Sequence, residues 1–239
     1  MYRVVTLATA ILGLAACSSE APIPEPSASA VIDTRFAPPG DEALPVMGPE
    51  RRILAVGDSL FAGYGLPSAA ESYPARLEAA LRAKGINARI ANASVSGDTS
   101  GAGAQRFAFV LKSQPAKPDL VIVELGGNDI LRGLPPAQTR ANLETMLREA
   151  RAAGVPVLLM GMLAPPNLGA EFKVKFEPIY PELARQYGAR LVPFFLAPVI
   201  GKPDLIQADH IHPNAQGVDA IVAATRDAVA GAIPPAKAG

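Results

Sequence analysis

The sequence is poor in several residue types that mark particular classes of protein. Its 239 residues include one cysteine, two histidines and no tryptophan, and aromatic residues make up 5% of the chain. A single cysteine excludes an internal disulfide and any cysteine-rich metal site. Basic and acidic residues number 22 each, so the formal net charge is zero. Because the chain has neither a basic surplus nor aromatic stacking platforms, we expect no nucleic-acid partner.

The one cysteine stands at the end of an apolar N-terminal segment. A short basic start at residues 1–3 precedes a small and apolar run over residues 4–16, which is too short to span a membrane but suits a signal-peptide core. The residues Leu-Ala-Ala-Cys at 14–17 resemble the lipobox of bacterial lipoproteins. That resemblance implies a signal peptide over residues 1–16 and a mature chain that starts at a lipidated Cys17. The alternative is an ordinary secretory signal that is cut nearby.

The resemblance to lipoproteins also implies a location. Ser18 and Ser19 follow the cysteine in place of an aspartate, a pattern that goes with the outer membrane in Gram-negative bacteria. We therefore expect a cell-envelope protein whose membrane contact is a lipid anchor at Cys17, on the periplasmic face of the outer membrane if the bacterium is Gram-negative. Residues 17–50 are proline-rich and keep no period, which predicts a semi-extended tether. The alternative is an arm that packs on the domain.

From residue 51 onward, apolar runs of strand length alternate with segments of helical pattern. Strands are predicted over residues 52–56, 88–91, 120–125, 155–160 and 190–193. Helices are predicted over residues 73–84, 101–111, 139–153, 171–187 and 214–231. This alternation predicts an α/β domain in which helices cover both faces of a parallel sheet. We assign the domain to residues 51–231 and a C-terminal tail to residues 232–239.

The first predicted strand leads to a serine that is a candidate nucleophile. Residues 53–56 form an unbroken apolar run, as expected of a strand buried on both faces, and Gly57, Asp58 and Ser59 follow it. Open α/β sheets bind ligands beyond the carboxyl ends of their strands, where Ser59 is expected. The alternative is that Asp58 or Ser59 only caps the next helix.

A serine nucleophile needs a base, and histidine is the usual one. The two histidines, His210 and His212, lie in the segment 209–214 just before the last predicted helix. Asp209 precedes His212 by three residues, so a tight turn can bring their side chains together. His212 would then face Ser59, and His210 would point elsewhere. The same segment could hold zinc, but the proline and helix that follow argue against the extended backbone that a His-x-His site needs.

Acyl transfer also needs hydrogen-bond donors for the oxyanion that forms in the transition state. Asn128, in the Gly-Gly-Asn-Asp segment 126–129 after the third predicted strand, offers a side-chain amide. Gly97, after the second predicted strand, offers a backbone N–H that no side chain obstructs. The N–H of Ser59 is a third donor. A turn would also explain the segment 126–129, but three strand ends that each present a suitable group favour a catalytic site.

These segments come in the order of the motif blocks of the SGNH (GDSL) hydrolases. The blocks are Gly-Asp-Ser-Leu at 57–60, Ser-Gly-Asp-Thr-Ser at 96–100, Gly-Gly-Asn-Asp at 126–129 and Asp-His-Ile-His-Pro-Asn at 209–214. Their flanks resemble the arylesterase, thioesterase I and lysophospholipase L1 branch. The resemblance covers about residues 51–231. It implies a flavodoxin-like three-layer α/β/α sandwich with a five-stranded parallel sheet, and it implies no cofactor.

The resemblance also implies a role for each site residue. Ser59 would be the nucleophile, His212 the base and Asp209 the partner that orients the base. The Ser59 amide, the Gly97 amide and the Asn128 side chain would form the oxyanion hole.

The chain departs from the family pattern at two positions, neither of which is a catalytic one. Ile130 stands where a small residue is frequent, and His210 stands where a glycine-type residue is usual. Both departures bear on the shape of the pocket. Ser59 also lacks a glycine two residues later, which excludes the α/β-hydrolase elbow and predicts a more open site.

The implied activity is the hydrolysis of carboxylic esters through an acyl-enzyme. The substrate classes are small-molecule or lipid esters: aryl esters, short or medium acyl esters, thioesters and lysophospholipids. Apolar residues after the third and fourth strands could line an acyl groove. They are Leu131, Leu134, Met162, Leu163, Pro165, Pro166, Leu168 and Phe172. The alternatives are an O-deacetylase of acetylated cell-envelope glycans and a lipoprotein that keeps the fold only for binding.

Overall fold

The structure is a computed structural model that describes residues 46–235 of the chain. The predicted signal peptide, Cys17, nearly all of the predicted tether and the last four residues lie outside the described residues. Within the described part, no helix combines the length and the apolar character that a membrane crossing requires.

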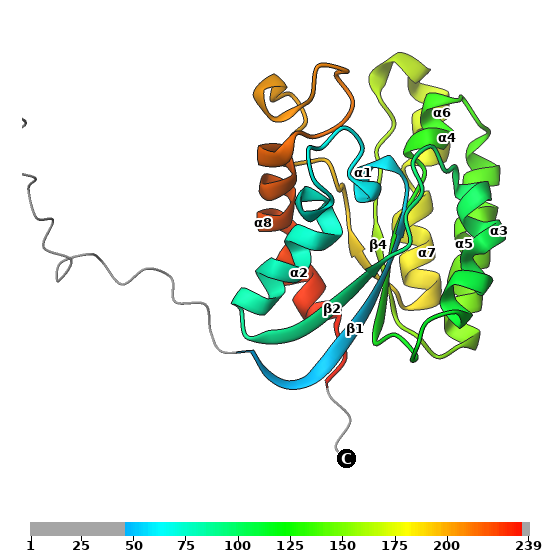
Figure 1. Cartoon of the computed structure of the whole chain (residues 1–239). Helices are drawn as coiled ribbons and strands as arrows, with labels where there is room; N and C mark the ends of the chain where they lie inside the picture. The colour runs from blue at the N-terminus through cyan, green and yellow to red at the C-terminus, as the bar shows by residue number, and fades with distance from the viewer. Residues whose placement is uncertain (1–45, 236–239) are drawn as a thin grey trace, which may run out of the picture. The chain divides into compact units, whose positions relative to one another are not determined.

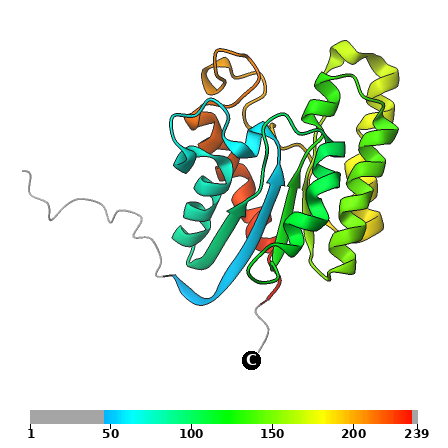
Figure 2. The ribbon, with the colours of Figure 1, turned by 45° about the vertical axis from the view of Figure 1, so that its right-hand side comes forward.

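Five parallel strands form one sheet in the order β2-β1-β3-β4-β5. They are β1 (Met47–Gly57), β2 (Ile86–Asn92), β3 (Leu120–Glu124), β4 (Val157–Met160) and β5 (Arg190–Val192). Helices flank the sheet on both faces (Figures 1 and 2), so the predicted three-layer α/β/α fold is confirmed.

Eight α-helices connect or follow the strands in the described residues. They are α1 (Ser59–Ala62), α2 (Tyr73–Ala83), α3 (Ser100–Lys112), α4 (Gly127–Leu131), α5 (Pro136–Ala152), α6 (Gly169–Phe176), α7 (Ile179–Tyr187) and α8 (Ala215–Ala232). Three 3-10 turns, η2 (Ala69–Glu71), η3 (Pro166–Leu168) and η4 (Pro203–Leu205), lie between them. Helices α2 and α8 pack against each other on one face, whereas α3, α5 and α7 form the layer on the other (Figure 1).

The core is built on the central strands. All five residues of β3, all four of β4 and the second half of β1 are buried. Continuous apolar runs of this kind fit strands that are covered by helices on both faces. One residue breaks the pattern, because the last position of β3 is the buried carboxyl residue Glu124.

The register of the central strands brings the motif blocks to one edge of the sheet. Gly57 at the end of β1 pairs with Glu124 at the end of β3, and Ala55 pairs with Asn92 at the end of β2. Parallel strands that end level with each other place the segments that follow them side by side. The edge that carries α1 and α4 is uppermost in Figure 1, and the first residues of β1 lie at the opposite edge.

Two of the predicted boundaries are wrong. Strand β1 begins at Met47, which pairs with Ile86, so residues 47–50 belong to the sheet and not to the predicted tether. The predicted helix over residues 171–187 is two helices, α6 and α7, which are separated at Pro178. Proline lacks the N–H that a continuous helix needs and crowds the preceding turn, so a new helix begins there.

Helix α8 lies very close to the loop that precedes it. Asn214 caps α8 by accepting from the Gly217 N–H at 2.9 Å, and its own side-chain amide donates to the Asp204 carbonyl at 2.8 Å. Ile206 and Pro213 form an antiparallel bridge across the base of the loop. A Cβ atom on Gly217 would lie 2.2 Å from the Leu205 carbonyl oxygen, so only glycine allows this approach.

Replacing Gly217 with alanine is expected to lower the free energy of unfolding by about 1–3 kcal/mol, because backbone atoms would have to move. Gly231 is a matched control in the same helix, since a Cβ there meets nothing within 4 Å. Gly231→Ala is expected to raise the free energy of unfolding by about 0.5 kcal/mol through helix propensity. Urea unfolding of the three proteins measures both changes. Two variants of equal stability would contradict the close approach.

Candidate active site

A chain of hydrogen bonds joins the predicted serine, histidine and aspartate. His212 Nε2 lies 2.9 Å from Ser59 Oγ, and His212 Nδ1 lies 2.6 Å from Asp209 Oδ2. Since an ionised carboxylate only accepts, Nδ1 carries the ring proton and donates it to Asp209. Nε2 is then free to accept the proton of the Ser59 hydroxyl. The structure therefore brings these three residues together from two distant parts of the sequence.

Asp209 is held in position by hydrogen bonds within its own turn. Asp209 Oδ1 accepts the backbone N–H groups of Ile211 at 2.9 Å and His212 at 3.0 Å. The His212 backbone N–H, the His212 ring and the Ile211 N–H lower the pKa of Asp209 to about 2. His210 adopts a left-handed backbone with a φ of 60°, which is where the family pattern has a glycine-type residue. This conformation closes the turn and directs Asp209 toward His212.

Two residues that the sequence did not single out hold the histidine in place. The backbone N–H of Gln207 donates to the His212 carbonyl at 2.8 Å, and its side-chain amide donates to the Tyr64 carbonyl at 2.8 Å and the Pro213 carbonyl at 2.9 Å. The Tyr64 ring lies against the His212 ring with centroids 4.7 Å apart. Tyr64 lies in a flank of the first motif block, whereas no sequence pattern marks Gln207.

The three predicted oxyanion donors line the same pocket as His212. Ser59 begins helix α1, Asn128 lies in the first turn of α4, and Gly97 sits in a turn with a φ of 86°, in the left-handed region that favours glycine. Arg132, just beyond α4, donates to the Gly97 carbonyl at 2.8 Å. This bond ties the turn that carries one donor to the helix that carries another.

Asp58 caps helix α1, as the alternative interpretation of the first motif block predicted, and it also holds the side chain of Asn128. Its Oδ1 accepts the Leu60 N–H at 3.0 Å, which caps α1, and its Oδ2 accepts from the side-chain amide of Asn128 at 3.0 Å. An amide group has two hydrogens. With one directed to Asp58, the orientation of Asn128 is fixed and the second is available to a ligand. Asp58 itself is buried, and burial raises its pKa.

Behind Asp58 lies a second buried carboxyl group, that of Glu124. Its side chain is fully buried, and its Oε2 lies 3.4 Å from the Asp58 backbone N. Burial is the largest cause that raises the pKa of Glu124 well above its usual range, and the neighbouring Asp58 charge is the next. No sequence pattern marks this residue as functional, because it lies within a run, residues 120–125, that is otherwise apolar and typical of a buried strand.

A third buried carboxyl, Asp129, fastens the Gly97 turn to α4. It accepts the Ser100 N–H at 2.7 Å, the Ser100 hydroxyl, and the Thr139 hydroxyl at 2.9 Å. The side-chain amide of Asn142, on α5, donates to the Ser100 hydroxyl at 3.0 Å. This network connects the start of α3 to both α4 and α5, so it fixes the distance between two of the predicted oxyanion donors, Gly97 and Asn128.

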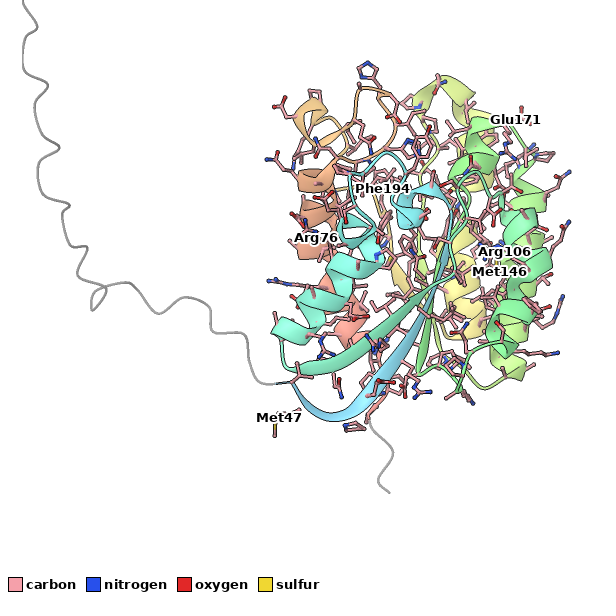
Figure 3. The ribbon with its side chains drawn as sticks, viewed as in Figure 1. Met47, Arg76, Arg106, Met146, Glu171 and Phe194 are labelled. Carbon is pink, nitrogen blue, oxygen red and sulfur yellow. The ribbon has the colours of Figure 1, made fainter. Side chains whose placement is uncertain are left out.

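The pocket above these groups has a volume of about 730 Å³. Five of the eight residues predicted for an acyl groove line it: Leu131, Met162, Leu163, Pro165 and Pro166. The other three, Leu134, Leu168 and Phe172, do not, and the last two pack on the core instead. The loop after β5 adds three lining residues that were not predicted, namely Phe194 (labelled in Figure 3), Leu196 and Ile200.

The two departures from the family pattern both line this pocket. Ile130 is nearly buried beside Asn128, and His210 lies at the pocket wall next to Ile211. Within residues 46–235, no three histidine, cysteine, aspartate or glutamate side chains are placed to hold a metal ion.

Comparison with known proteins gives a consistent result. The sequence model of the GDSL-like Lipase/Acylhydrolase family matches residues 55–220. Esterase TesA of Pseudomonas aeruginosa is 45% identical over 161 residues, which are 67% of this chain and 79% of TesA. Thioesterase 1/protease 1/lysophospholipase L1 of Escherichia coli K12 is 43% identical over 162 residues, 68% of this chain and 75% of that protein. The crystal structure of AlinE4, an SGNH-hydrolase family esterase, is 63% identical, has a TM-score of 0.67, and covers 79% of this chain and 99% of AlinE4.

The hydrogen bonds to Asp209 predict how its carboxyl group titrates. We expect a pKa of about 2 by carboxyl-carbon NMR. In His212→Ala it should rise but stay below the ordinary value of about 3.9, because both backbone donors remain. Since the folded pKa lies below the unfolded one, Asp209 stabilises the fold above about pH 3.9, and that stabilisation is lost as the pH falls toward 2. An ordinary pKa in the native protein would contradict the turn geometry.

Proposed function

Because this chain belongs to the GDSL-like (SGNH) lipase/acylhydrolase family and is a carboxylic ester hydrolase, we propose that Ser59 is its nucleophile, His212 its general base and Asp209 the residue that orients the base. The observation that carries this proposal is the continuous hydrogen-bond chain from Asp209 through His212 to the Ser59 hydroxyl, which opens into the apolar pocket.

Each step of the reaction follows from these contacts. Ser59 Oγ attacks the carbonyl carbon of the ester while Nε2 of His212 takes the hydroxyl proton. The imidazolium that forms is stabilised by the ionised Asp209 at Nδ1. His212 then gives the proton to the leaving alcohol or thiol, and an acyl-enzyme remains on Ser59. A water molecule repeats the sequence and releases the acid.

The oxyanion is stabilised by three donors that are already oriented. The amides of Ser59 and Gly97 are backbone groups, and the Asn128 amide is held by Asp58. Donors that are fixed before the reaction need no reorganisation when negative charge develops.

The lining of the pocket supports an acyl or aryl ester as substrate. Its wall is formed mainly by aliphatic and aromatic side chains that contribute no hydrogen-bond donors, such as Met162, Phe194 and Ile200. Such a wall favours an apolar acyl chain, because each buried methylene contributes about 0.8 kcal/mol. A sugar ring with free hydroxyl groups would leave those groups without partners. This argument favours an esterase of aryl or short to medium acyl esters over a glycan O-deacetylase.

We also propose that the protein is attached to the cell envelope through a lipid on Cys17. The support is the lipobox-like sequence at residues 14–17. The described chain enters β1 at the edge of the sheet opposite helix α1, which Ser59 begins.

Removal of the nucleophile and removal of an oxyanion donor are expected to have different effects. Ser59→Ala should lower kcat by about 10⁶ and abolish labelling by a fluorophosphonate probe. Asn128→Ala should lower kcat by about 10²–10³ and leave labelling detectable. Asn87→Ala removes an amide on β2, away from the pocket, and is the matched control with unchanged kcat. Full esterase activity in Ser59→Ala, measured with p-nitrophenyl esters, would refute the proposed mechanism.

The substrate class is tested with a panel of p-nitrophenyl esters and an acetylated glycan. We expect kcat/KM to rise about fourfold per methylene from acetate toward hexanoate, the factor that corresponds to about 0.8 kcal/mol. The acetylated glycan should release less acetate than p-nitrophenyl acetate does at equal concentration. The opposite order on these two acetyl substrates would identify a glycan O-deacetylase.

A further inference from the structure

The buried carboxyl of Glu124 has no part in the mechanism above, yet it lies directly behind the active site. It is the last residue of β3, its side chain is fully buried, and the rest of that strand is apolar. Its Oε1 has no hydrogen-bond partner among the described residues when the carboxyl is treated as an acceptor. Its Oε2 accepts one backbone N–H, that of Asp58, at the long distance of 3.4 Å. A buried polar group with so little support is costly, so its presence calls for a physical reason.

The neighbours of Glu124 decide which form of the carboxyl is present. Its carboxyl group contacts the backbone N–H of Asp58, and the charge of the buried Asp58 carboxyl is one of the causes that raise the pKa of Glu124. Two buried carboxylates cannot both be ionised in contact, so the pair shares a proton. Asp58 is the better site for the negative charge, because it accepts from the Leu60 N–H and the Asn128 amide and lies near His212. Glu124 is therefore the neutral partner, and its hydroxyl is available to donate to Asp58.

The backbone is arranged so that this contact can form. Gly57 pairs with Glu124 across the sheet, and a Cβ atom on Gly57 would lie 2.8 Å from Glu124 Oε2. The absence of a side chain at Gly57 leaves the space in which the Glu124 carboxyl reaches Asp58. The first motif block thus contributes a glycine that makes room, an acceptor and the serine in three successive residues.

We propose that Glu124 is a positioning residue for ester hydrolysis: as a neutral acid it donates a hydrogen bond to Asp58, which in turn holds one N–H of Asn128 and directs the other toward the oxyanion. This inference rests on the proposed role of Asn128. Glu124 touches neither the substrate nor the reacting atoms, and it acts on the transition state only through Asp58 and Asn128. Its loss therefore lowers kcat and leaves KM nearly unchanged, since the oxyanion exists only in the transition state.

The test compares two replacements of similar length that differ in one property. Glutamine at position 124 keeps a hydrogen-bond donor for Asp58, whereas methionine fills the same space without one. We expect Glu124→Gln to retain kcat within about threefold. Glu124→Met should lower kcat by about tenfold or more, with KM changed less than twofold. The matched control is Glu149→Met on α5, where a carboxyl oxygen is likewise buried without a partner, and kcat there should not change.

A double-mutant cycle shows whether Glu124 acts through Asn128. In the Asn128→Ala background, Glu124→Met should cause no further loss of kcat, because the amide that Asp58 orients is gone. A loss as large as in the native background would overturn the proposal, as would native kcat in Glu124→Met. Equal losses in Glu124→Gln and Glu124→Met, with melting temperatures like that of the native protein, would also overturn it.

The outcomes separate this inference from the function on which it rests. If Ser59→Ala or Asn128→Ala kept native kcat, the proposed mechanism itself would fail. If both lost activity as expected while Glu124→Met kept native kcat, only the role of Glu124 would fail. Near-UV circular dichroism and thermal melting of each variant verify that the losses occur in a folded protein.

Discussion

The site depends on the parallel pairing of β1 with both β2 and β3. Because Gly57 lies opposite Glu124 and Ala55 lies opposite Asn92, the three strands end at nearly the same height. The segments that follow them must therefore share one small volume, and each brings one group: the Ser59 hydroxyl, the Gly97 amide and the Asn128 side chain. A shift of one strand by a single residue would separate these groups and would also turn buried side chains toward the wrong face.

Much of this arrangement could be predicted from the sequence, because it follows from patterns that are local or scarce. Five apolar runs alternate with helical segments, and that alternation is enough to specify a parallel sheet. Since the chain has only two histidines, elimination leaves few candidates for a base, and the spacing of Asp209 and His212 favours one of them. The helix break at Pro178 was missed, although proline is a local signal, because the apolar spacing continues across it.

The parts that escaped prediction depend on contacts between distant segments. Gln207 is an ordinary loop glutamine until folding places it between the turn of Tyr64 and the loop of His212. Glu124 reads as the polar end of a strand until the pairing with Gly57 buries it. Helices α1 and α4 have four and five residues, too few to show a helical period. Of these features, the buried carboxyl of Glu124 is the one that carries a cost in stability.

The close approach of α8 to the loop that carries Asp209 and His212 has a consequence for the timing of synthesis. The proposed nucleophile Ser59 lies near the start of the domain, but the loop with its proposed base is held by Gly217 in the final helix and by Asn214, which caps that helix. A nascent chain that lacks this helix lacks the contacts that hold the loop of His212 in place beside Ser59. The hydrogen-bond chain from Asp209 to Ser59 is therefore complete only when the last segment of the domain has docked.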